Sequence, residues 1–383
     1  MKLKNIPGWF SNYNLFIVKI NIIILSMAFI TAPVLNSAVK SDLHAANSIN
    51  ENTGYEKINS LKSQNNPSAL KYSLELVEGS EAPLIDEKNP GSMGNNHGYE
   101  CGQVFRGQNK YHMFITERVD TVNSGCDLTR TGHWISTDGI VWTRVGTLQN
   151  SIKTPNIPGY ATWSPMPVYD KDENRWNIFY VAYEVNNTYG RIIRAYSKVK
   201  GIDGLDGPYI NSTDTVLSYF DDNKNLWEDK QGTDSFYPFQ SGNKWYGFYG
   251  GSDAATFWDV GLTEANSLTG HWTRVIDNPV FTYSENPIVV TFENGIKFCV
   301  YDDLAHGIID CHSIGYGYSS DGINWVQKYL SIPMPKWAAS IRTPLSFIYE
   351  GNDIYIIYFT ALTSSSWDGF EKIGRIRVRL VKN

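Results

Sequence analysis

Three carboxylic side chains stand at corresponding places in the chain, each just before a short apolar run. They are Glu100, Asp234 and Glu285. Carboxyl groups that share one site can carry out acid–base chemistry, because one can hold a proton while another is ionised. The three residues are therefore candidate catalytic residues if the fold brings them together. Each also has a structural alternative: Glu285 could bond to turn amides, Asp234 could cap a turn, and Glu100 stands beside Cys101, which could form a disulfide.

Two further positions of the same kind carry other side chains. Trp163 and Ser164 precede a proline in one of them, and Arg342 precedes Thr-Pro in the other. Arg342 has two interpretations. It either pairs with one of the acids and stabilises the structure, or its guanidinium clamps a carboxylate or sulfate group of a ligand.

These positions belong to a pattern that the chain repeats five times. Each copy is an Asn followed by a short aromatic run, as in Asn174-Arg-Trp-Asn-Ile-Phe-Tyr and Asn243-Lys-Trp-Tyr-Gly-Phe-Tyr, and successive copies begin 51 to 69 residues apart. A second apolar run lies about ten residues before each Asn, with turn-forming residues between, so each pair predicts a β-hairpin. Repeats of this length indicate units that pack on one another to bury a common core.

Two more strands are predicted in each unit. The motifs Ser136-Thr-Asp-Gly-Ile-Val-Trp142 and Ser320-Asp-Gly-Ile-Asn-Trp325 predict tight hairpins, because Asp-Gly supplies positive φ angles. The Trp of each motif is expected to fill the gap between units. Four antiparallel strands in five units, with no long helical period, predict an all-β fold, a five-bladed β-propeller with four antiparallel strands per blade.

The propeller places the candidate residues around one point. The innermost strand of each blade lines the central channel, so the residues before those strands surround the channel mouth. Three of these five entrances carry a carboxylate, one carries Arg342 and one carries Trp163.

Several short motifs resemble those of the five-bladed propeller glycosidases. They are the blade endings Ala195-Tyr-Ser to Gly207-Pro-Tyr and Ala265-Asn-Ser to Gly270-His-Trp, the Ser-x-Asp-Gly-x-x-Trp hairpins, and the entrances Trp163-Ser-Pro and Glu285-Asn-Pro. This group includes the family 43 arabinanases and xylosidases, the family 32 invertases and the family 117 anhydrogalactosidases. The resemblance covers about residues 95–383 and selects no single family. It implies hydrolysis of a glycosidic bond in a plant or algal oligosaccharide or polysaccharide.

The resemblance also implies roles for the acids. Glycosidic cleavage needs one protonated acid at the leaving oxygen and one carboxylate that activates water or attacks the sugar. By position, Glu100 would be the base, while Asp234 and Glu285 would share the acid and pKa-tuning roles, with inversion of configuration. The match is imperfect. The first-blade residue of those families is Asp, and the middle residue of their trio lies on an earlier blade than Asp234.

A loop in the fourth unit, Tyr301-Asp-Asp-Leu-Ala-His-Gly307, adds two candidates. His306 is a candidate proton donor, as in some family 117 enzymes that use His as the acid. Asp303 is a candidate substrate-binding residue, although a plain surface turn is the alternative. The other expected substrate-binding residues are Ser164, Arg342 and Trp163, whose flat face could stack on a sugar ring.

We expect no required cofactor and no catalytic metal. The two loop acids match no calcium loop, although a structural divalent cation such as calcium is an open alternative. The net charge of −6, with no basic block, argues against a nucleic-acid partner. A monomer is expected. A non-catalytic carbohydrate-binding propeller is the main alternative to a hydrolase, and a protein-binding scaffold is another.

The N-terminal segment predicts export to a secreted or periplasmic location. Lys2 and Lys4 precede a largely apolar run, Ile20 to Leu35, and small residues follow it. We expect residues 1–46 to be a signal peptide and processing region, 47–80 a disordered polar linker, and 81–383 the catalytic propeller. Membrane contact is expected only through the signal segment. An uncleaved anchor is the alternative.

Cysteine content leaves two possibilities open. An exported chain permits disulfides, and the positions favour one bridge within the first unit, Cys101–Cys126, and one within the fourth, Cys299–Cys311. Four buried thiols are the alternative.

Overall fold

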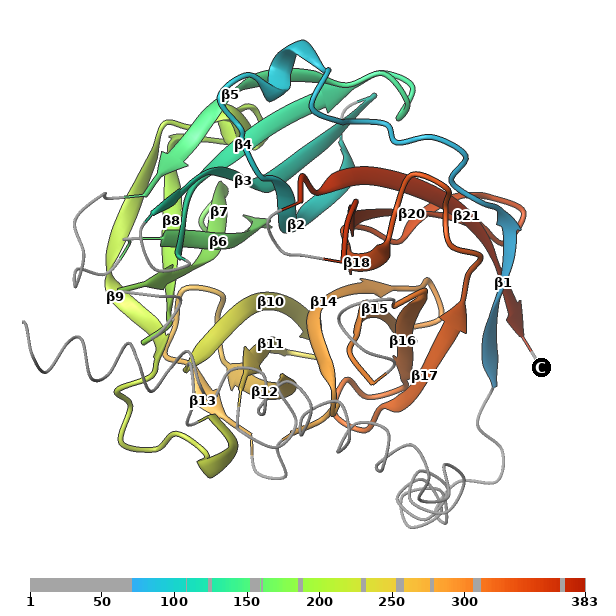
Figure 1. The fold of residues 1–383 in the computed structure, drawn as a ribbon. Coiled ribbons are helices and arrows are strands. Elements are labelled where there is room, and N and C mark those ends of the chain that lie inside the picture. The colour runs from blue at the N-terminus through green and yellow to red at the C-terminus, as the bar shows by residue number, and fades with distance from the viewer. Residues whose placement is uncertain are drawn as a thin grey trace, which may run out of the picture. The chain divides into compact units, whose positions relative to one another are not determined.

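A computed structural model describes residues 71–107, 109–122, 126–151, 159, 161–184, 189–228, 232–252, 258–275, 279–305, 311–365 and 369–382. They belong to one compact unit, Lys71–Asn383. Five antiparallel sheets are arranged around a common axis, which confirms the five-bladed β-propeller (Figure 1). Within these residues no helix is long and apolar enough to cross a membrane.

The first four blades are meanders of four strands in chain order, and the innermost strand of each comes first (Figure 1). Their strands are β2 (Gly98–Gly107), β3 (Lys110–Val122), β4 (Cys126–Ser136) and β5 (Thr143–Asn150); β6 (Ala161–Asp170), β7 (Arg175–Tyr183), β8 (Arg191–Lys200) and β9 (Tyr209–Ser218); β10 (Thr233–Ser241), β11 (Lys244–Gly251), β12 (Asp259–Ala265) and β13 (Thr273–Arg274); and β14 (Ser284–Thr291), β15 (Lys297–Asp303), β16 (Ser313–Ser319) and β17 (Val326–Ser331). Three short 3-10 helices lie between strands: η2 (Pro90–Ser92), η3 (Ile202–Asp206) and η4 (Leu226–Glu228).

The fifth blade combines strands from both ends of the folded unit. Its inner edge is β18 (Ser340–Pro344) and β19 (Ile348–Gly351), both paired with β20 (Ile354–Leu362). The next strand is β21 (Lys372–Lys382), and β1 (Tyr72–Glu78) pairs with it as the outermost strand. The ring of blades is therefore closed by a strand that precedes the first blade in sequence.

This closure corrects the predicted linker. Residues 47–80 were expected to be disordered, but β1 occupies residues 72–78. Tyr72 and Leu74 are 0% and 6% exposed and alternate with polar residues, so the segment has the period of a half-buried strand. The Tyr72 ring also packs edge-on against Tyr318 of the fourth blade, with ring centroids 5.2 Å apart.

The two Asp-Gly motifs connect paired antiparallel strands, as predicted, but through loops of six residues instead of tight turns, and only their glycines have positive φ. Asp138 Oδ1 accepts hydrogen bonds from the N–H groups of the second and third residues after it, at 2.8 and 2.9 Å, and Asp321 Oδ1 does the same at 2.8 Å. Trp142, at the end of the first of these motifs, packs edge-on against Tyr358 of the fifth blade, with ring centroids 5.6 Å apart. It fills the gap between the two blades, as expected.

The predicted disulfides are wrong. Cys101, Cys299 and Cys311 are free, buried thiols, and the side chain of Cys126 lies outside the described residues. Cys299 lies opposite Gly317 inside the sheet of the fourth blade. The thiol of Cys311 instead donates a 3.3 Å hydrogen bond to the main-chain oxygen of Asp303, the last residue of β15.

Candidate active site

All five innermost strands begin with an irregularity of pairing. The register shifts directly after Glu100, Trp163, Asp234 and Glu285, and between Ile341 and Pro344 in the fifth blade. A β-bulge leaves an extra residue unpaired and bends the strand. In four blades the residue after the shift has a positive φ of 37° to 54°. Such conformations cost energy in non-glycine residues and concentrate at functional sites.

The bulge residues form a ring of small, buried polar side chains around the axis, which we call the axial ring. Its members are Cys101, Ser164, Ser235, Asn286 and Thr343, each 4% exposed or less. Ser164 Oγ donates a 3.2 Å hydrogen bond to Asn286 Oδ1. Because the second and fourth blades are not neighbours in the ring, this bond crosses the axis. The side chains therefore close the channel at this level.

The residues just before the bulges form a second, charged group, which we call the entrance cluster. It contains Glu100, Asp234, Glu285, Arg342 and, from β15, Asp302, all between 2% and 8% exposed. The structure thus brings together the three carboxylates that the sequence singled out, each from a different blade.

Arg342 is the hub of the entrance cluster. Its Nη2 donates a 3.0 Å hydrogen bond to Glu100 Oε1 and lies 3.8 Å from Glu285 Oε2. Its Nη1 lies 2.9 Å from Asp302 Oδ2 as an ion pair. The three acids keep Arg342 charged by raising its pKa, against the opposing effect of burial. Of the two interpretations of Arg342, these contacts match the pairing with acids.

Asp234 and Glu285 are neighbouring buried acids that influence each other's pKa. Burial raises the pKa of Glu285 well above its usual range, and the negative charge of Asp234 raises it further. Burial also raises the pKa of Asp234, while the hydrogen bond from Glu285 opposes that rise. Two buried acids in direct contact cannot both ionise easily, so the pair retains one proton, which Glu285 holds.

The fifth member of the entrance cluster, Asp302, was not chosen from the sequence. The hairpin register places Glu285 opposite Asp302, and Ser284 opposite Asp303. Adjacent residues of a strand point to opposite faces, so only Asp302 meets Arg342. Burial raises the pKa of Asp302 to about 6, although Arg342 acts in the opposite direction.

The other predicted site residues have different surroundings. Asp303 Oδ2 accepts a 2.7 Å hydrogen bond from Ser313 Oγ, at the start of β16. Trp163 is 7% exposed and belongs to the apolar core cluster of the second and third blades, together with Phe179 and Phe236. His306 lies outside the described residues.

Metal coordination has no visible basis in the described part of the chain. Nowhere in it do three or more His, Cys, Asp or Glu side chains form a group that could hold a metal ion. The expectation that no cofactor is required stays a prediction.

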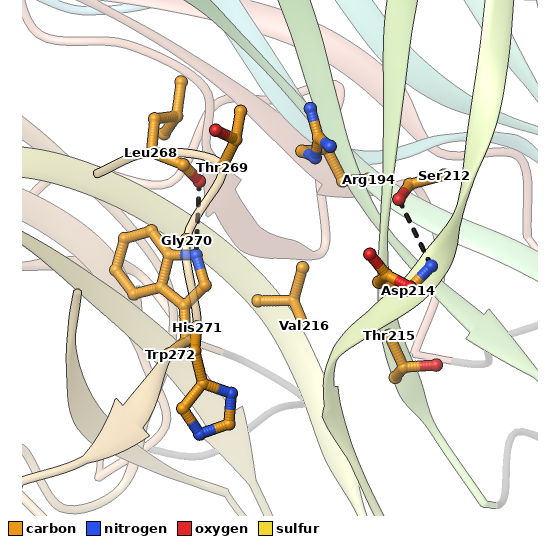
Figure 2. Close-up of a pocket in the computed structure, with 10 residues that line it drawn as sticks. All are labelled: Arg194, Ser212, Asp214, Thr215, Val216, Leu268, Thr269, Gly270, His271 and Trp272. Carbon is orange, nitrogen blue, oxygen red and sulfur yellow. Dashed lines mark hydrogen bonds between the residues drawn. The ribbon is translucent and has the colours of Figure 1, made fainter. Parts of the chain in front are cut away.

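A separate cavity of about 240 Å³ lies at the outer side of the second and third blades (Figure 2). It is lined by Asp214 and its neighbours on β9 and by the segment 268–272 that precedes β13. In its wall, Trp272 Nε1 donates a 3.3 Å hydrogen bond to Leu268 O. No residue of the entrance cluster lines this cavity.

Comparison with known proteins gives matches at the level of structure. No family model matches the chain, and no curated protein matches its sequence. A family 117 glycoside hydrolase produced by the marine bacterium Zobellia galactanivorans is 17% identical over 81% of this chain and 90% of that chain, with a TM-score of 0.58. The α-L-arabinofuranosidase of Podospora anserina is 11% identical over 79% and 97%, with a TM-score of 0.55. A thermostable family 43 glycoside hydrolase is 17% identical over 77% and 91%, with a TM-score of 0.51. The chain therefore has the fold of the five-bladed propeller glycoside hydrolases.

Proposed function

We propose that the protein is an exported glycoside hydrolase that cleaves a glycosidic bond of a plant or algal oligosaccharide or polysaccharide. The observation that carries this proposal is the convergence of Glu100 and Glu285 on Arg342 at the start of the innermost strands, with Asp234 beside Glu285. The structural neighbours support the reaction class, since they include an arabinofuranosidase and exo-β-1,3-galactanases.

Glu285 is the proposed general acid. A general acid must hold its proton near neutral pH and release it to the leaving oxygen in the transition state. The raised pKa of Glu285, caused by burial and by Asp234, meets the first requirement. Asp234 then acts as the residue that keeps Glu285 protonated, because its negative charge raises the pKa of Glu285.

Glu100 is the proposed general base. Its carboxyl group accepts a 3.0 Å hydrogen bond from Arg342 Nη2, which fixes its position opposite Glu285. Glu100 and Glu285 both contact Arg342 Nη2, so their nearest oxygens are no farther apart than the sum of 3.0 and 3.8 Å. Paired carboxyl groups of glycosidases lie about 5 to 9.5 Å apart, so this pair falls at the shorter end of that range. The resemblance to family 43 enzymes, rather than this distance, is the ground on which we propose inversion, with Glu100 activating a water molecule.

Substrate release tests this proposal. The purified protein would be incubated with arabinan, galactan, xylan and agar oligosaccharides, and the products read by mass and by anomeric NMR. Release of sugar with inverted configuration supports the proposal, retention would correct the mechanism, and binding without release would favour the non-catalytic carbohydrate-binding alternative. The reaction needs no cofactor, so protein treated with EDTA should keep its activity.

Export is tested on the protein itself. We propose that the mature protein is secreted or periplasmic, and the expected result is a mass that lacks the segment before about residue 46. Recovery of the protein in the cytoplasm with its intact N-terminus would contradict this.

A further inference from the structure

Three aromatic side chains form an exposed cluster outside the entrance cluster, which we call the aromatic platform. Tyr189, Tyr219 and Phe220 have ring centroids 5.1 to 5.6 Å apart in all three pairs. Tyr189 is 39% exposed and Phe220 is 55% exposed. Most of the other aromatic rings of the propeller are buried between strands, so a group of exposed rings indicates a surface that binds something.

The aromatic platform lies at the same end of the propeller as the entrance cluster. Tyr189 precedes the start of β8, and Phe220 follows the end of β9; in an antiparallel meander both points fall at the end where β6 begins. Gly190 forms a bridge with Gly232, and Thr233 Oγ1 donates a 3.0 Å hydrogen bond to the main-chain oxygen of Gly190.

The distance to the acids is short. Thr233 directly precedes Asp234 in β10. At a rise of about 3.3 Å per residue in a strand, the bridge between the two glycines lies about 7 Å from Asp234. A ligand with more than one sugar ring can therefore reach from the entrance cluster to the aromatic platform.

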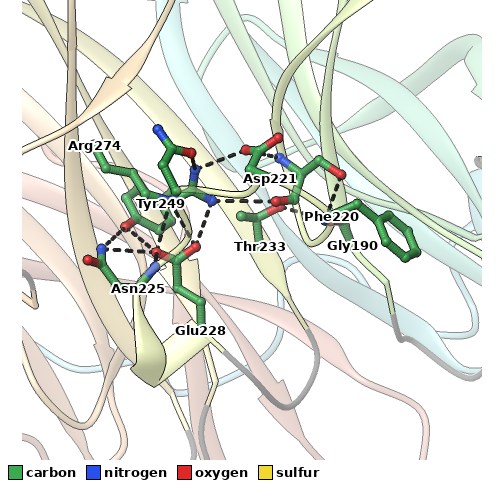
Figure 3. Close-up of polar contacts among 10 residues, drawn as sticks. Gly190, Phe220, Asp221, Asn225, Glu228, Thr233, Tyr249 and Arg274 are labelled. Carbon is green, nitrogen blue, oxygen red and sulfur yellow. Dashed lines mark hydrogen bonds and ion pairs between the residues drawn. The ribbon is translucent and has the colours of Figure 1, made fainter.

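A buried ion pair fixes the segment that carries Tyr219 and Phe220. Arg274 Nη2 lies 2.7 Å from Glu228 Oε2, and Arg274 Nη1 lies 2.9 Å from Asp221 Oδ2 (Figure 3). The side chains of Arg274 and Glu228 are 5% and 1% exposed, and Tyr249 donates a 2.9 Å hydrogen bond to Glu228. A binding surface held in place before the ligand arrives loses less entropy on binding.

The chemistry of the aromatic platform matches a sugar ring. Aromatic rings offer flat apolar faces, against which the C–H face of a sugar can pack. The Arg191 guanidinium lies over the Phe220 ring, 5.0 Å from its centre, and Lys224 Nζ lies over the Tyr219 ring, 4.1 Å from its centre. Each cation therefore covers one face of its ring and places hydrogen-bond donors beside the exposed surface of Tyr189 and Phe220. The exposed surface of three side chains is far smaller than the roughly 800 Å² that each partner buries in a stable protein interface. The aromatic platform is therefore too small to be such an interface.

We propose that the aromatic platform is a subsite that stacks on one sugar ring of an oligosaccharide whose scissile bond lies at the entrance cluster. This inference rests on the proposed function, and it deepens it: the preferred substrate is a chain of several sugar residues rather than a short glycoside. Tyr189 and Phe220 supply the exposed surface, and Tyr219 supports them.

The test compares Tyr189→Ala and Phe220→Ala with a matched control, Tyr349→Ala. Tyr349 is 58% exposed and lies on β19, at the opposite end of the inner edge of its blade. Retardation of each protein would be measured by native electrophoresis in gels that contain arabinan, galactan or agarose. Wild type and Tyr349→Ala should be retarded equally in at least one gel, and each platform variant should bind that polysaccharide about 10-fold more weakly. Unchanged melting temperatures would show that the platform variants are folded.

Kinetics separate this inference from the proposed function. In both platform variants the loss in kcat/KM should grow with the number of sugar residues in the substrate. A loss that is equal for short and long substrates, or unchanged binding in both variants, would overturn the subsite and leave the hydrolase standing. Binding that depends on Phe220 without any release of sugar would support the subsite and overturn the hydrolase.

Discussion

Arg342 on the fifth blade donates a 3.0 Å hydrogen bond to Glu100 on the first blade, across the seam where the ring of blades closes. The same guanidinium forms a 2.9 Å ion pair with Asp302 on the fourth blade. One buried cation therefore compensates acids from both neighbouring blades, and the charge balance of the entrance cluster depends on it. The residues of the axial ring follow those of the entrance cluster in the innermost strands, and their side chains close the channel next to it.

Replacement of Arg342 by Met should strongly destabilise the protein. Removal of one partner of a buried ion pair leaves the other charges uncompensated, at a cost of about 3 to 5 kcal/mol. The measurement is urea unfolding near pH 7. The control is Arg379→Met, since the side chain of Arg379 is 53% exposed and its surface pair is worth about 1 kcal/mol or less.

The same variant has a pH signature. Because the pKa of Asp302 is raised to about 6, its carboxylate becomes neutral as pH falls below that value and no longer needs a cation. The destabilisation by Arg342→Met should therefore be smaller at pH 5 than at pH 7. An equal or larger effect at pH 5 would contradict the ion-pair account.

Replacement of Asp234 by Asn should move the alkaline limb of the activity profile to lower pH. The charge of Asp234 raises the pKa of Glu285, so without that charge Glu285 loses its proton at a lower pH. The measurement is kcat/KM against pH. Asp303→Asn serves as the control, because its carboxylate bonds to Ser313, and its alkaline limb should stay in place. A shift of the alkaline limb to higher pH in Asp234→Asn would disprove the electrostatic effect of Asp234 on Glu285.

His133 should make the protein sensitive to acid. Burial lowers the pKa of His133 from 6.5 to about 3, and the neighbouring His112 acts in the same direction. An unfolded histidine titrates near 6.5, so between about pH 6.5 and 3 the unfolded chain binds a proton that the folded chain excludes. Stability therefore falls as pH decreases through this interval, by up to about 1.4 kcal/mol per pH unit.

The variant His133→Gln tests this linkage. Relative to wild type, its free energy of unfolding should rise steadily as pH is lowered from about 6.5 to 4. His271→Gln, which replaces an exposed histidine, is the control and should follow wild type. Parallel curves for wild type and His133→Gln would refute the assignment.

Replacement of Tyr72 by Ala should loosen the closure of the ring. Tyr72 is fully buried on β1 and packs against Phe298 and Tyr318 of the fourth blade, so its removal leaves a cavity that costs about 3 to 5 kcal/mol. Val77→Ala on the same strand, 43% exposed, should cost far less. Equal midpoints of thermal unfolding for the two variants would show that Tyr72 on β1 does not stabilise the closed ring of blades.

The repeat pattern made the blades predictable from the sequence, because each hairpin is local and its turn residues stand beside its strands. The pattern also located Glu100, Asp234, Glu285 and Arg342, since all four lie among the first residues of the innermost strands. Features that depend on distant pairing were missed. β1 joins a strand about 300 residues away in the chain, and no local signal identifies that partner.

Register explains the remaining differences at the site. Asp302 and Asp303 are adjacent and chemically alike, and only the pairing of Asp302 with Glu285 selects the one that meets Arg342. The register also shifts directly after Trp163, whose side chain belongs to an apolar core cluster, and its stacking on a sugar ring stays a prediction. A sequence pattern places both residues at the channel mouth but does not fix which way a side chain points beside a bulge.

The central claim is that Glu285 acts as an acid in glycosidic cleavage, and the most direct test compares wild type with Glu285→Gln. Both proteins would be incubated with the oligosaccharide that wild type cleaves best, and released sugar would be quantified over time by mass spectrometry, beside a thermal melt of each protein. We expect a loss of turnover of about 10²-fold or more with a nearly unchanged melting temperature, because Gln matches the shape of the protonated acid. Full turnover by Glu285→Gln, or no release of sugar by wild type from any oligosaccharide, would contradict the account.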